Sequence, residues 1–256
     1  MEKENPKLII GAIIQARMGS TRLPGKVLMD IMGKPMLWHL INRLKFSKRI
    51  NEVILAIPDT KENDALEKFA EENKIKYFRG SEEDVLSRYF KAAQKFKCDL
   101  IVRMTSDCPL IDPKIADLVI EKHLNYGADF TANFLEGKRG ETLERTFLHG
   151  TELEVFNFST LENAYQQAKE PYQREHVDPY IFEHPEIFKI AAIKNTEDVS
   201  YMRCTVDEMK DLELVREIYK RLYKKGEIFF MEDVVNLLKT HPELMEINKE
   251  VKRKQI

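Results

Sequence analysis

The feature that most constrains the fold is a regular alternation of apolar, strand-like segments with amphipathic, helix-like segments over residues 8–134. Residues 8–14 are apolar on both faces, as in a strand that is covered by helices on each side. Further strands are predicted at 53–57, 75–78, 100–104 and 129–134, with a helix in each interval. Four β-α units in series predict an α/β protein with a mostly parallel sheet, right-handed crossovers and helices on both faces.

Residue types that begin helices support this alternation. Pro35 precedes a stripe of apolar residues at helical spacing, and Asp112-Pro113 has the form of a cap followed by proline. Ser81 has the position expected of the N-cap of the helix whose apolar residues begin at Val85. Each signal falls between two predicted strands.

The pattern changes in the second half of the chain. Residues 137–150 are glycine-rich and charged without clear periodicity, and Thr151 to Phe158 alternates like an exposed strand. Because there is no internal repeat or low-complexity linker, we expect a single domain over 1–256 with an inserted β segment near 134–160. The remaining predicted elements are strands at 188–193 and 202–206 and a long amphipathic helix at 209–223.

Charge and composition exclude several classes of protein. The 256 residues contain 41 Lys plus Arg against 43 Asp plus Glu, a net charge of −2, so neither indiscriminate nucleic-acid binding nor membrane-surface binding is expected. The apolar run at 8–14 is far short of the roughly 20 residues that span a bilayer, and its acidic and polar flanks do not suit a signal peptide. Cys98, Cys108 and Cys204 form no Cys-x-x-Cys pair, which argues against structural zinc and for a reduced, cytoplasmic compartment.

The turn after the first predicted strand concentrates glycines and cations. It reads Ala16-Arg17-Met18-Gly19-Ser20-Thr21-Arg22-Leu23-Pro24-Gly25-Lys26. Glycines let backbone N–H groups approach an anion, arginine offers a planar fork to phosphate oxygens, and lysine adds a mobile point charge. In an open parallel sheet this turn lies at the carboxyl edge, where ligands bind. We therefore interpret it as a polyphosphate-binding loop rather than a solvated basic turn.

Two known phosphate-binding loops do not match this turn. A P-loop has four residues between its glycines and Ser or Thr after its lysine, whereas here five residues separate Gly19 from Gly25 and Val27 follows Lys26. The dinucleotide-binding fingerprint carries no basic cluster. The turn therefore belongs to neither class.

Polar residues also follow three later apolar runs. Arg79-Gly80-Ser81 follows the run at 75–78 and is a candidate for contact with a base or a phosphate. Asp107 follows the fourth predicted strand, and Asp207 follows a later one. Magnesium is commonly held by one or two carboxylates together with substrate phosphates, so Asp107 and Asp207 are a candidate magnesium pair. Taken alone, each aspartate is more typical of a cap or a turn.

The segment Gln173-Arg174-Glu175-His176-Val177 carries three side chains of functional type. No Ser-His-Asp order and no His-Glu-x-x-His motif accompanies it, so neither hydrolase nor zinc chemistry is indicated. A lone histidine is usually a packing or surface residue.

Several segments resemble one known family. IIQARMGSTRLPGKVL is similar to the signature loop of the cytidylyltransferases that make CMP-activated acidic sugars of the 3-deoxy-octulosonate and sialic-acid types. In the same order, RGSEEDVLSRY, SDCPLIDP, ELEVFNFSTLENA, REHVDPYIFEHPE and TVDEMKDLELV resemble motifs of the spore coat polysaccharide biosynthesis family. The resemblance spans about residues 8–225. It implies a Rossmann-like nucleotide-diphospho-sugar transferase fold.

The resemblance also implies roles for individual residues and a homodimer, with the segment near 134–160 reaching toward the partner. The implied catalytic residues are Arg17, Lys26 and Asp107, and the implied magnesium ligands are Asp107 and Asp207. The predicted nucleotide site comprises Ala16, Arg17, Gly19, Ser20, Arg22, Lys26, Arg79, Ser81, Arg103 and Ser106. The predicted acceptor site comprises Glu152, Glu154, Arg174 and His176.

One departure from the family concerns the acceptor. Members often carry Pro-Arg-Gly-Leu-Asp before the Glu-Val-Phe run, where this chain has Leu148 to Glu152. An arginine suited to an anionic acceptor is therefore missing, and Glu152 stands in place of Asp.

The expected reaction is transfer of CMP from CTP to an acidic sugar or similar acceptor, with release of pyrophosphate, for surface polysaccharide or glycan synthesis. Two alternatives stay open. A nucleotide-sugar-dependent glycosyltransferase usually presents Asp-x-Asp to its metal, and this chain has no such motif. A catalytically silent nucleotide-binding module would not need Lys26, Asp107 and Asp207 together.

Overall fold

The computed structural model describes residues 8–136 and 142–252, and a seven-stranded sheet is the centre of this part of the chain. Its strands are β1 (Ile10–Gln15), β4 (Glu52–Pro58), β5 (Lys76–Gly80), β6 (Leu100–Thr105), β7 (Phe130–Ala132), β10 (Glu154–Asn157) and β11 (Ile190–Ala192). The strand order is β11-β7-β10-β6-β1-β4-β5, and only β10 is antiparallel to its neighbours. The predicted α/β class with a mostly parallel sheet is confirmed.

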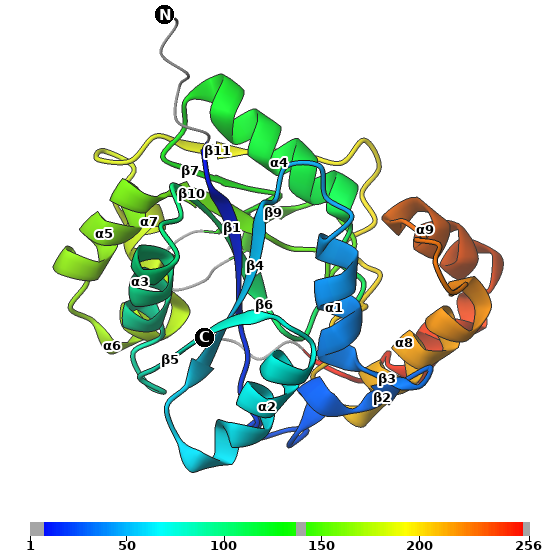
Figure 1. Cartoon of the computed structure of the whole chain (residues 1–256). Coiled ribbons are helices and arrows are strands. Elements are labelled where there is room, and N and C mark those ends of the chain that lie inside the picture. The colour runs from blue at the N-terminus through cyan, green and yellow to red at the C-terminus, as the bar shows by residue number, and fades with distance from the viewer. Residues whose placement is uncertain (1–7, 137–141, 253–256) are drawn as a thin grey trace, which may run out of the picture.

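Helices cover both faces of this sheet. Figure 1 shows α3, α5, α6 and α7 on one side and α1, α8 and α9 on the other. The helices are α1 (Met36–Leu44), α2 (Asp64–Glu72), α3 (Val85–Lys95), α4 (Pro113–Tyr126), α5 (Phe158–Gln167), α6 (Pro171–His176), α7 (Pro179–Glu183), α8 (Met209–Leu222) and α9 (Met231–Thr240). Short 3-10 helices lie at Lys26–Leu28, Lys61–Asn63 and Pro242–Ile247. Two small antiparallel pairs are β2 (Asp30–Ile31) with β3 (Lys34–Pro35), and β8 (Phe134–Glu136) with β9 (Thr142–Arg145).

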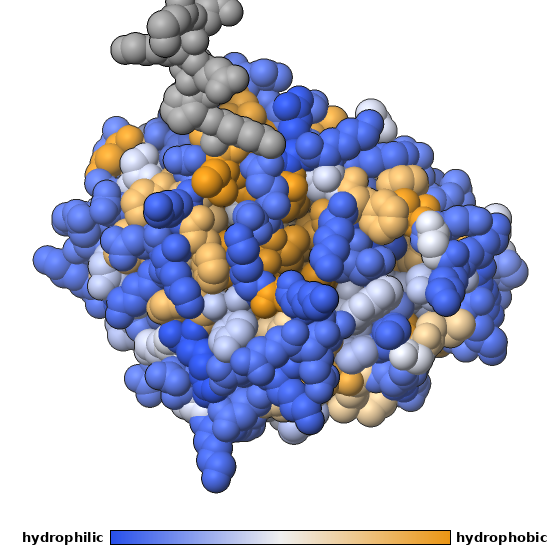
Figure 2. Space-filling view, in the orientation of Figure 1, coloured by the Kyte–Doolittle hydropathy of each residue, from blue (hydrophilic) through white to orange (hydrophobic). Residues whose placement is uncertain are grey.

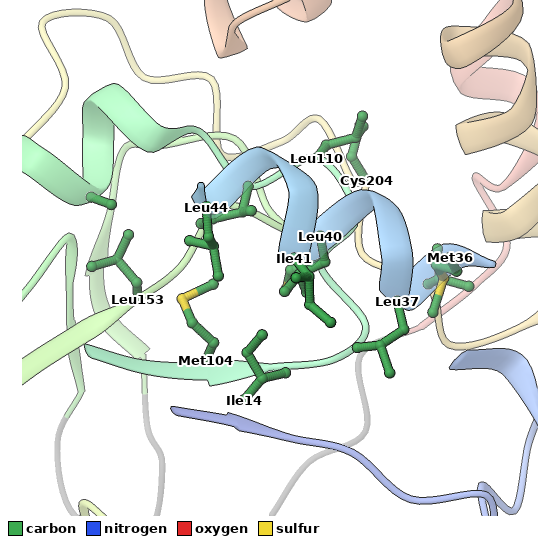
Figure 3. Packing of buried hydrophobic residues seen from close by; sticks show 14 of the residues in the cluster. Ile14, Met36, Leu37, Leu40, Ile41, Leu44, Met104, Leu110, Leu153 and Cys204 are labelled. Atoms are coloured by element: carbon green, nitrogen blue, oxygen red, sulfur yellow. The ribbon is translucent and has the colours of Figure 1, made fainter. Parts of the chain in front are cut away.

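The sheet separates two apolar clusters, which explains why β1 is apolar on both faces. Successive side chains of a strand point to opposite faces. Ile13 accordingly packs in the cluster that contains α3, and Ile14 in the cluster that contains α1. Figure 3 shows Leu44 of α1 directed toward Met104 of β6, with Ile14 beside it. Burial on both faces therefore fixes the position of β1 in the sheet.

Two of the three predicted helix starts are confirmed. Helix α1 begins directly after Pro35, and Asp112 Oδ1 caps α4 by accepting a hydrogen bond from the amide of Lys114 at 2.8 Å. The assignment of Ser81 as the N-cap of α3 was wrong. The cap is Asp84, whose Oδ1 accepts a hydrogen bond from the amide of Ser87. Ser81 Oγ instead accepts from the amide of Asp84, in the turn that precedes the helix.

The strand at 151–158 is not exposed, as the alternation suggested, but buried. Strand β10 lies between β6 and β7, so helices cover both of its faces. Its polar member, Glu154, is 6% exposed and forms an ion pair of 2.9 Å with Arg103, the residue directly opposite on β6. Glu154 therefore gave the sequence the alternation of an exposed strand, although it is buried and paired with Arg103.

The predicted strand at 202–206 was also wrong. Within the described residues this segment forms only an isolated bridge between His149 and Arg203. Further along the same segment, the amide of Val206 donates to the carbonyl of Asp107 at 2.8 Å. The segment therefore bonds to two different parts of the chain and does not pair along one strand. The inserted segment near 134–160 contributes the pair of β8 with β9 and then β10, and residues 137–141 of it lie outside the described residues.

Among the helices that the structure describes, none combines the length and apolar character needed to cross a bilayer. The face drawn in Figure 2 is mainly hydrophilic, with apolar side chains gathered near its centre.

Candidate active site

The loop after β1 is held by its own backbone and by one buried side chain. The amide of Met18 donates to Asn63 Oδ1 at 2.8 Å, and Asn63 is fully buried. The amide of Gly25 returns to the carbonyl of Met18 at 2.9 Å. Gly25 has a φ of 70°, in the left-handed region where a residue with a Cβ is strained, and this conformation turns the chain into the short helix that begins at Lys26.

Some donors of this loop have no acceptor within the described residues. In the described part of the chain, the amides of Gly19 and Arg22 donate to no acceptor, and the guanidinium of Arg17 has neither a hydrogen bond nor an ion pair. Ser20 is different, since its Oγ accepts a long hydrogen bond of 3.4 Å from the amide of Leu23. Unpaired amides beside cations are the arrangement that binds anions.

Lys26 joins the loop to both of the predicted metal ligands. Its ammonium donates to the carbonyl of Val206 at 2.6 Å, and lies 3.2 Å from Asp207 Oδ1 and 3.7 Å from Asp107 Oδ2. The residue is only 9% exposed. The structure thus brings together three residues that are separated by up to 181 positions in the sequence.

Backbone hydrogen bonds explain why the two aspartates meet. Asp107 follows β6 at the carboxyl edge of the sheet, and its carbonyl accepts from the amide of Val206 and, at 3.3 Å, from Thr205 Oγ1. Asp207 follows directly in the chain. The segment that contains Asp207 is therefore attached to the end of β6 although it is not a strand.

Asp207 is surrounded by cations. Besides Lys26 it pairs with Arg22 at 2.8 Å and with Arg203 at 2.7 Å. Burial alone would raise the pKa of Asp207, but Lys26, Arg203 and Arg22 together hold it below its ordinary value. The carboxylate is therefore ionised at neutral pH, and it is shared among these three cations.

Sequence reasoning missed two residues that position Asp207. Asp211 is fully buried and accepts from the amides of Asp207 and Glu208 at 2.9 and 3.0 Å. Arg203 donates to both Asp207 and Asp211. The spacing of Glu208 and Asp211 at the start of α8, where a reciprocal capping box forms, was the available signal.

The donor set at this point fits a magnesium ion. Asp107 and Asp207 supply two carboxylates that lie close to each other, since the ammonium of Lys26 is 3.7 Å from one and 3.2 Å from the other. No group of three or more His, Cys, Asp or Glu suited to a metal is present in the described ranges. Magnesium accepts such a site when phosphates and waters complete its coordination.

Other predicted nucleotide residues lie near the same sheet edge but have protein partners. Arg79 pairs with Asp64 at 2.9 Å and with Glu67, and donates to the carbonyl of Thr60. Arg103 is buried between Glu154 and Asp178. Ala16 is buried directly after β1, and Ser106 is half-buried directly before Asp107. Their roles toward a nucleotide, and that of Ser81, stay predictions.

The roles of the four predicted acceptor residues toward a substrate stay predictions. Glu152 accepts from Arg145 at 2.7 Å and from the amide of Gly150, while Glu154 is buried with Arg103. Arg174 donates to Asp84 through two nitrogens and therefore clamps the start of α3. His176 is half-buried at the last residue of α6.

A cationic loop with free amides that faces two carboxylates at the carboxyl edge of a parallel sheet is typical of an enzyme acting on a nucleoside triphosphate. The profile of the family described as Cytidylyltransferase matches residues 11–250. The spore coat polysaccharide biosynthesis protein SpsF of Bacillus subtilis is 32% identical over 239 residues, covering 90% of this chain and 94% of that protein. This chain belongs to the cytidylyltransferase family, which consists of CTP-dependent nucleotidyltransferases.

Solved structures agree with this assignment. A cytidylyltransferase from Leptospira borgpetersenii superposes with a TM-score of 0.85 at 36% identity, covering 93% of this chain and 97% of that one. The CMP:2-keto-3-deoxy-manno-octonic acid synthetase complexed with CTP has the same fold, with a TM-score of 0.63 at 20% identity and coverage of 84% and 100%. The fold and family that the sequence motifs implied are confirmed.

Proposed function

We propose that this protein transfers CMP from CTP to an acidic sugar or a related acceptor and releases pyrophosphate, for the synthesis of a surface polysaccharide or glycan. The observation that carries the proposal is the contact of one buried ammonium, Lys26, with both Asp107 and Asp207, beside a loop in which the amides of Gly19 and Arg22 have no acceptor among the described residues. The names of two similar proteins support it, since one is a spore coat polysaccharide biosynthesis protein and the other an octonic acid synthetase solved with CTP.

In the proposed reaction an acceptor oxygen forms a bond to the α-phosphorus of CTP, while the bond from that phosphorus to the bridging oxygen of pyrophosphate breaks. The acceptor oxygen belongs to a hydroxyl, a carboxylate or a phosphate. Negative charge grows on the departing pyrophosphate, and cations already in position lower the barrier. We assign this role to Lys26, Arg17 and Arg22, with the amides of Gly19 and Arg22 orienting the phosphates.

Magnesium is part of the proposal. Asp107 and Asp207 would hold it together with the triphosphate, and when bound it would neutralise charge on the phosphates. Lys26 holds these two carboxylates close together before the substrate arrives.

The proposal includes a homodimer, on the strength of the family resemblance. Sedimentation equilibrium at micromolar protein would give twice the 30.1 kDa mass of the chain. A single species at 30.1 kDa would contradict the dimer without affecting the proposed reaction.

The direct test of function measures pyrophosphate release with CTP, UTP, GTP or ATP and a panel of acidic sugars, in the presence of Mg²⁺. We expect release with CTP and one class of acceptor. Asp107→Ala is expected to lower the turnover by about a hundredfold, whereas the exposed Asp198, which accepts hydrogen bonds from Ser200, provides the control variant Asp198→Ala. No release with any combination would favour a silent nucleotide-binding module instead.

A further inference from the structure

Both carboxylate oxygens of Asp207 contact cations of the protein itself. Oδ1 lies 2.8 Å from a terminal nitrogen of Arg22 and 3.2 Å from the ammonium of Lys26, and Oδ2 accepts from Arg203 at 2.7 Å. Oδ1 is the oxygen on the side of Asp107, because the same ammonium of Lys26 also reaches Asp107. Two donors occupy both lone pairs of Oδ1. A metal ion held jointly by Asp107 and Asp207 must therefore displace one of them.

Of the three cations, Arg22 is the one that the fold holds least. Arg203 is anchored by a second ion pair of 3.1 Å with the fully buried Asp211. The buried ammonium of Lys26 donates to the carbonyl of Val206 at 2.6 Å. The side chain of Arg22 is 31% exposed, and its other contacts are long, at 3.8 Å to Glu208 and 3.4 Å to a backbone carbonyl near the C-terminus.

The charges at this point balance without any ligand. The cations of Arg22 and Lys26 face the carboxylates of Asp107 and Asp207, while Arg203 is matched by Asp211. A divalent cation alone would add positive charge next to Arg22. A triphosphate alone would add negative charge next to the two carboxylates. Because each ligand supplies the charge that the other lacks, the site favours binding them together.

We propose that Arg22 exchanges partners during the reaction cycle, from Asp207 in the free protein to the triphosphate in the complex. The exchange uncovers Asp207 Oδ1 only when the triphosphate has arrived, so binding of the metal ion depends on the nucleotide. Arg22 is thereby a positioning residue for the metal site as well as a phosphate ligand. The inference deepens the proposed reaction and rests on it for the identity of the triphosphate.

The first test measures metal binding without any nucleotide. Mn²⁺ is the probe, because it takes the same oxygen ligands as Mg²⁺ and the EPR signal of the free ion reports its binding. We expect Arg22→Gln to bind Mn²⁺ at least about tenfold more tightly than the wild type, since a like charge and a competing donor have left Asp207. The gain should disappear in Arg22→Gln/Asp207→Asn.

Two other arginines provide controls for metal binding. Arg17→Gln removes an exposed cation of the same loop that is not among the partners of Asp207, and so measures the effect of net charge. Arg49→Gln breaks an ion pair of the same 2.8 Å length, with Glu121. At physiological ionic strength, neither variant should tighten Mn²⁺ binding by more than about twofold.

The second test measures competition for Arg22 as a double-mutant cycle. Calorimetry gives the Kd for CTP in EDTA for the wild type, Arg22→Gln, Asp207→Asn and the double variant. Repulsion between Asp207 and the phosphates acts in both backgrounds, whereas competition for the guanidinium acts only where Arg22 is present. We therefore expect Asp207→Asn to tighten CTP binding at least about threefold more in the wild-type background than in Arg22→Gln.

Equal Mn²⁺ affinity of the wild type and Arg22→Gln, or no measurable binding to either, would overturn the inference. So would an equal effect of Asp207→Asn in both backgrounds, or a gain in Arg17→Gln as large as that in Arg22→Gln. Failure of the proposed function is distinguishable, since the wild type would then release no pyrophosphate. The Mn²⁺ comparison uses no nucleotide, and inorganic tripolyphosphate replaces CTP in the cycle.

Discussion

At the scale of single residues, Lys26 connects the phosphate loop to the two aspartates, and its removal is the sharpest single change. Lys26→Ala leaves Asp207 paired with Arg22 and Arg203, so we expect the fold to remain intact. The rate of pyrophosphate release should fall about a hundredfold, the typical loss for one preorganised charged donor. Lys68→Ala is the control, because that lysine is exposed and pairs with the equally exposed Glu72. Near-normal release by Lys26→Ala would refute its assigned role.

Asp207 makes stability depend on pH in a defined direction. Its pKa in the folded protein lies below the value of about 3.9 for an unperturbed aspartate. The ionised form therefore stabilises the fold above that value, and this stabilisation is lost as the pH falls through the folded-state pKa. Urea unfolding of wild type and Asp207→Asn should show a constant difference in free energy between about pH 5 and 7 that shrinks below about pH 4. A difference that grows on acidification would contradict the charge environment described for Asp207.

At the scale of elements, Gly150 holds the segment before β10 against the segment that leads to Asp207. Its φ is +109°, and a Cβ there would lie 2.6 Å from the amide nitrogen of Thr205 and 2.7 Å from the carbonyl carbon of Cys204. Gly150→Ala should therefore both destabilise the protein and displace Asp207, so that the melting temperature and CTP turnover fall together.

Gly127, at the C-cap of α4, provides the matched comparison for this change. Its φ is +60°, and nothing lies within 4 Å of an added Cβ. Gly127→Ala should cost only the backbone strain of about 1 kcal/mol and leave turnover unchanged. If the two variants lose the same stability and the same activity, close packing at Gly150 is not what positions Asp207.

The sequence was sufficient for the parallel sheet and for the central trio of the site. Apolar runs identified the strands of the central sheet. Lys26, Asp107 and Asp207, which the sequence analysis assigned to one site, lie together in the structure. The sequence was insufficient where the burial of a residue depends on a partner that is distant in the chain. Glu154 looked solvent-facing because its partner Arg103 is 51 positions away.

The same reason explains what was missed. The segment at 202–206 has the composition of a strand but bonds to two segments from distant parts of the chain, so no local pattern reveals that it is not one.

At the scale of the whole molecule, the three cysteines report on the integrity of both layers of the core. Cys98 belongs to the cluster on the α3 side, and Cys108 and Cys204 belong to the cluster on the α1 side. Burial raises the pKa of Cys98 to about 11 and that of Cys204 to about 12, and raises the pKa of Cys108 as well. Since the thiolate is the reactive form, Ellman's reagent at pH 8 should leave all three unmodified in the native protein and titrate three thiols in urea. Rapid modification of the native protein would mean that one face of the sheet is open.

The most direct measurement of the central claim is a crystal structure of the protein with CTP and Mg²⁺. The account predicts that the triphosphate lies within hydrogen-bond distance of the amides of Gly19 and Arg22 and of the ammonium of Lys26, with Asp107 and Asp207 facing it. A triphosphate bound away from this loop, or with Lys26 directed out of the site, would contradict it.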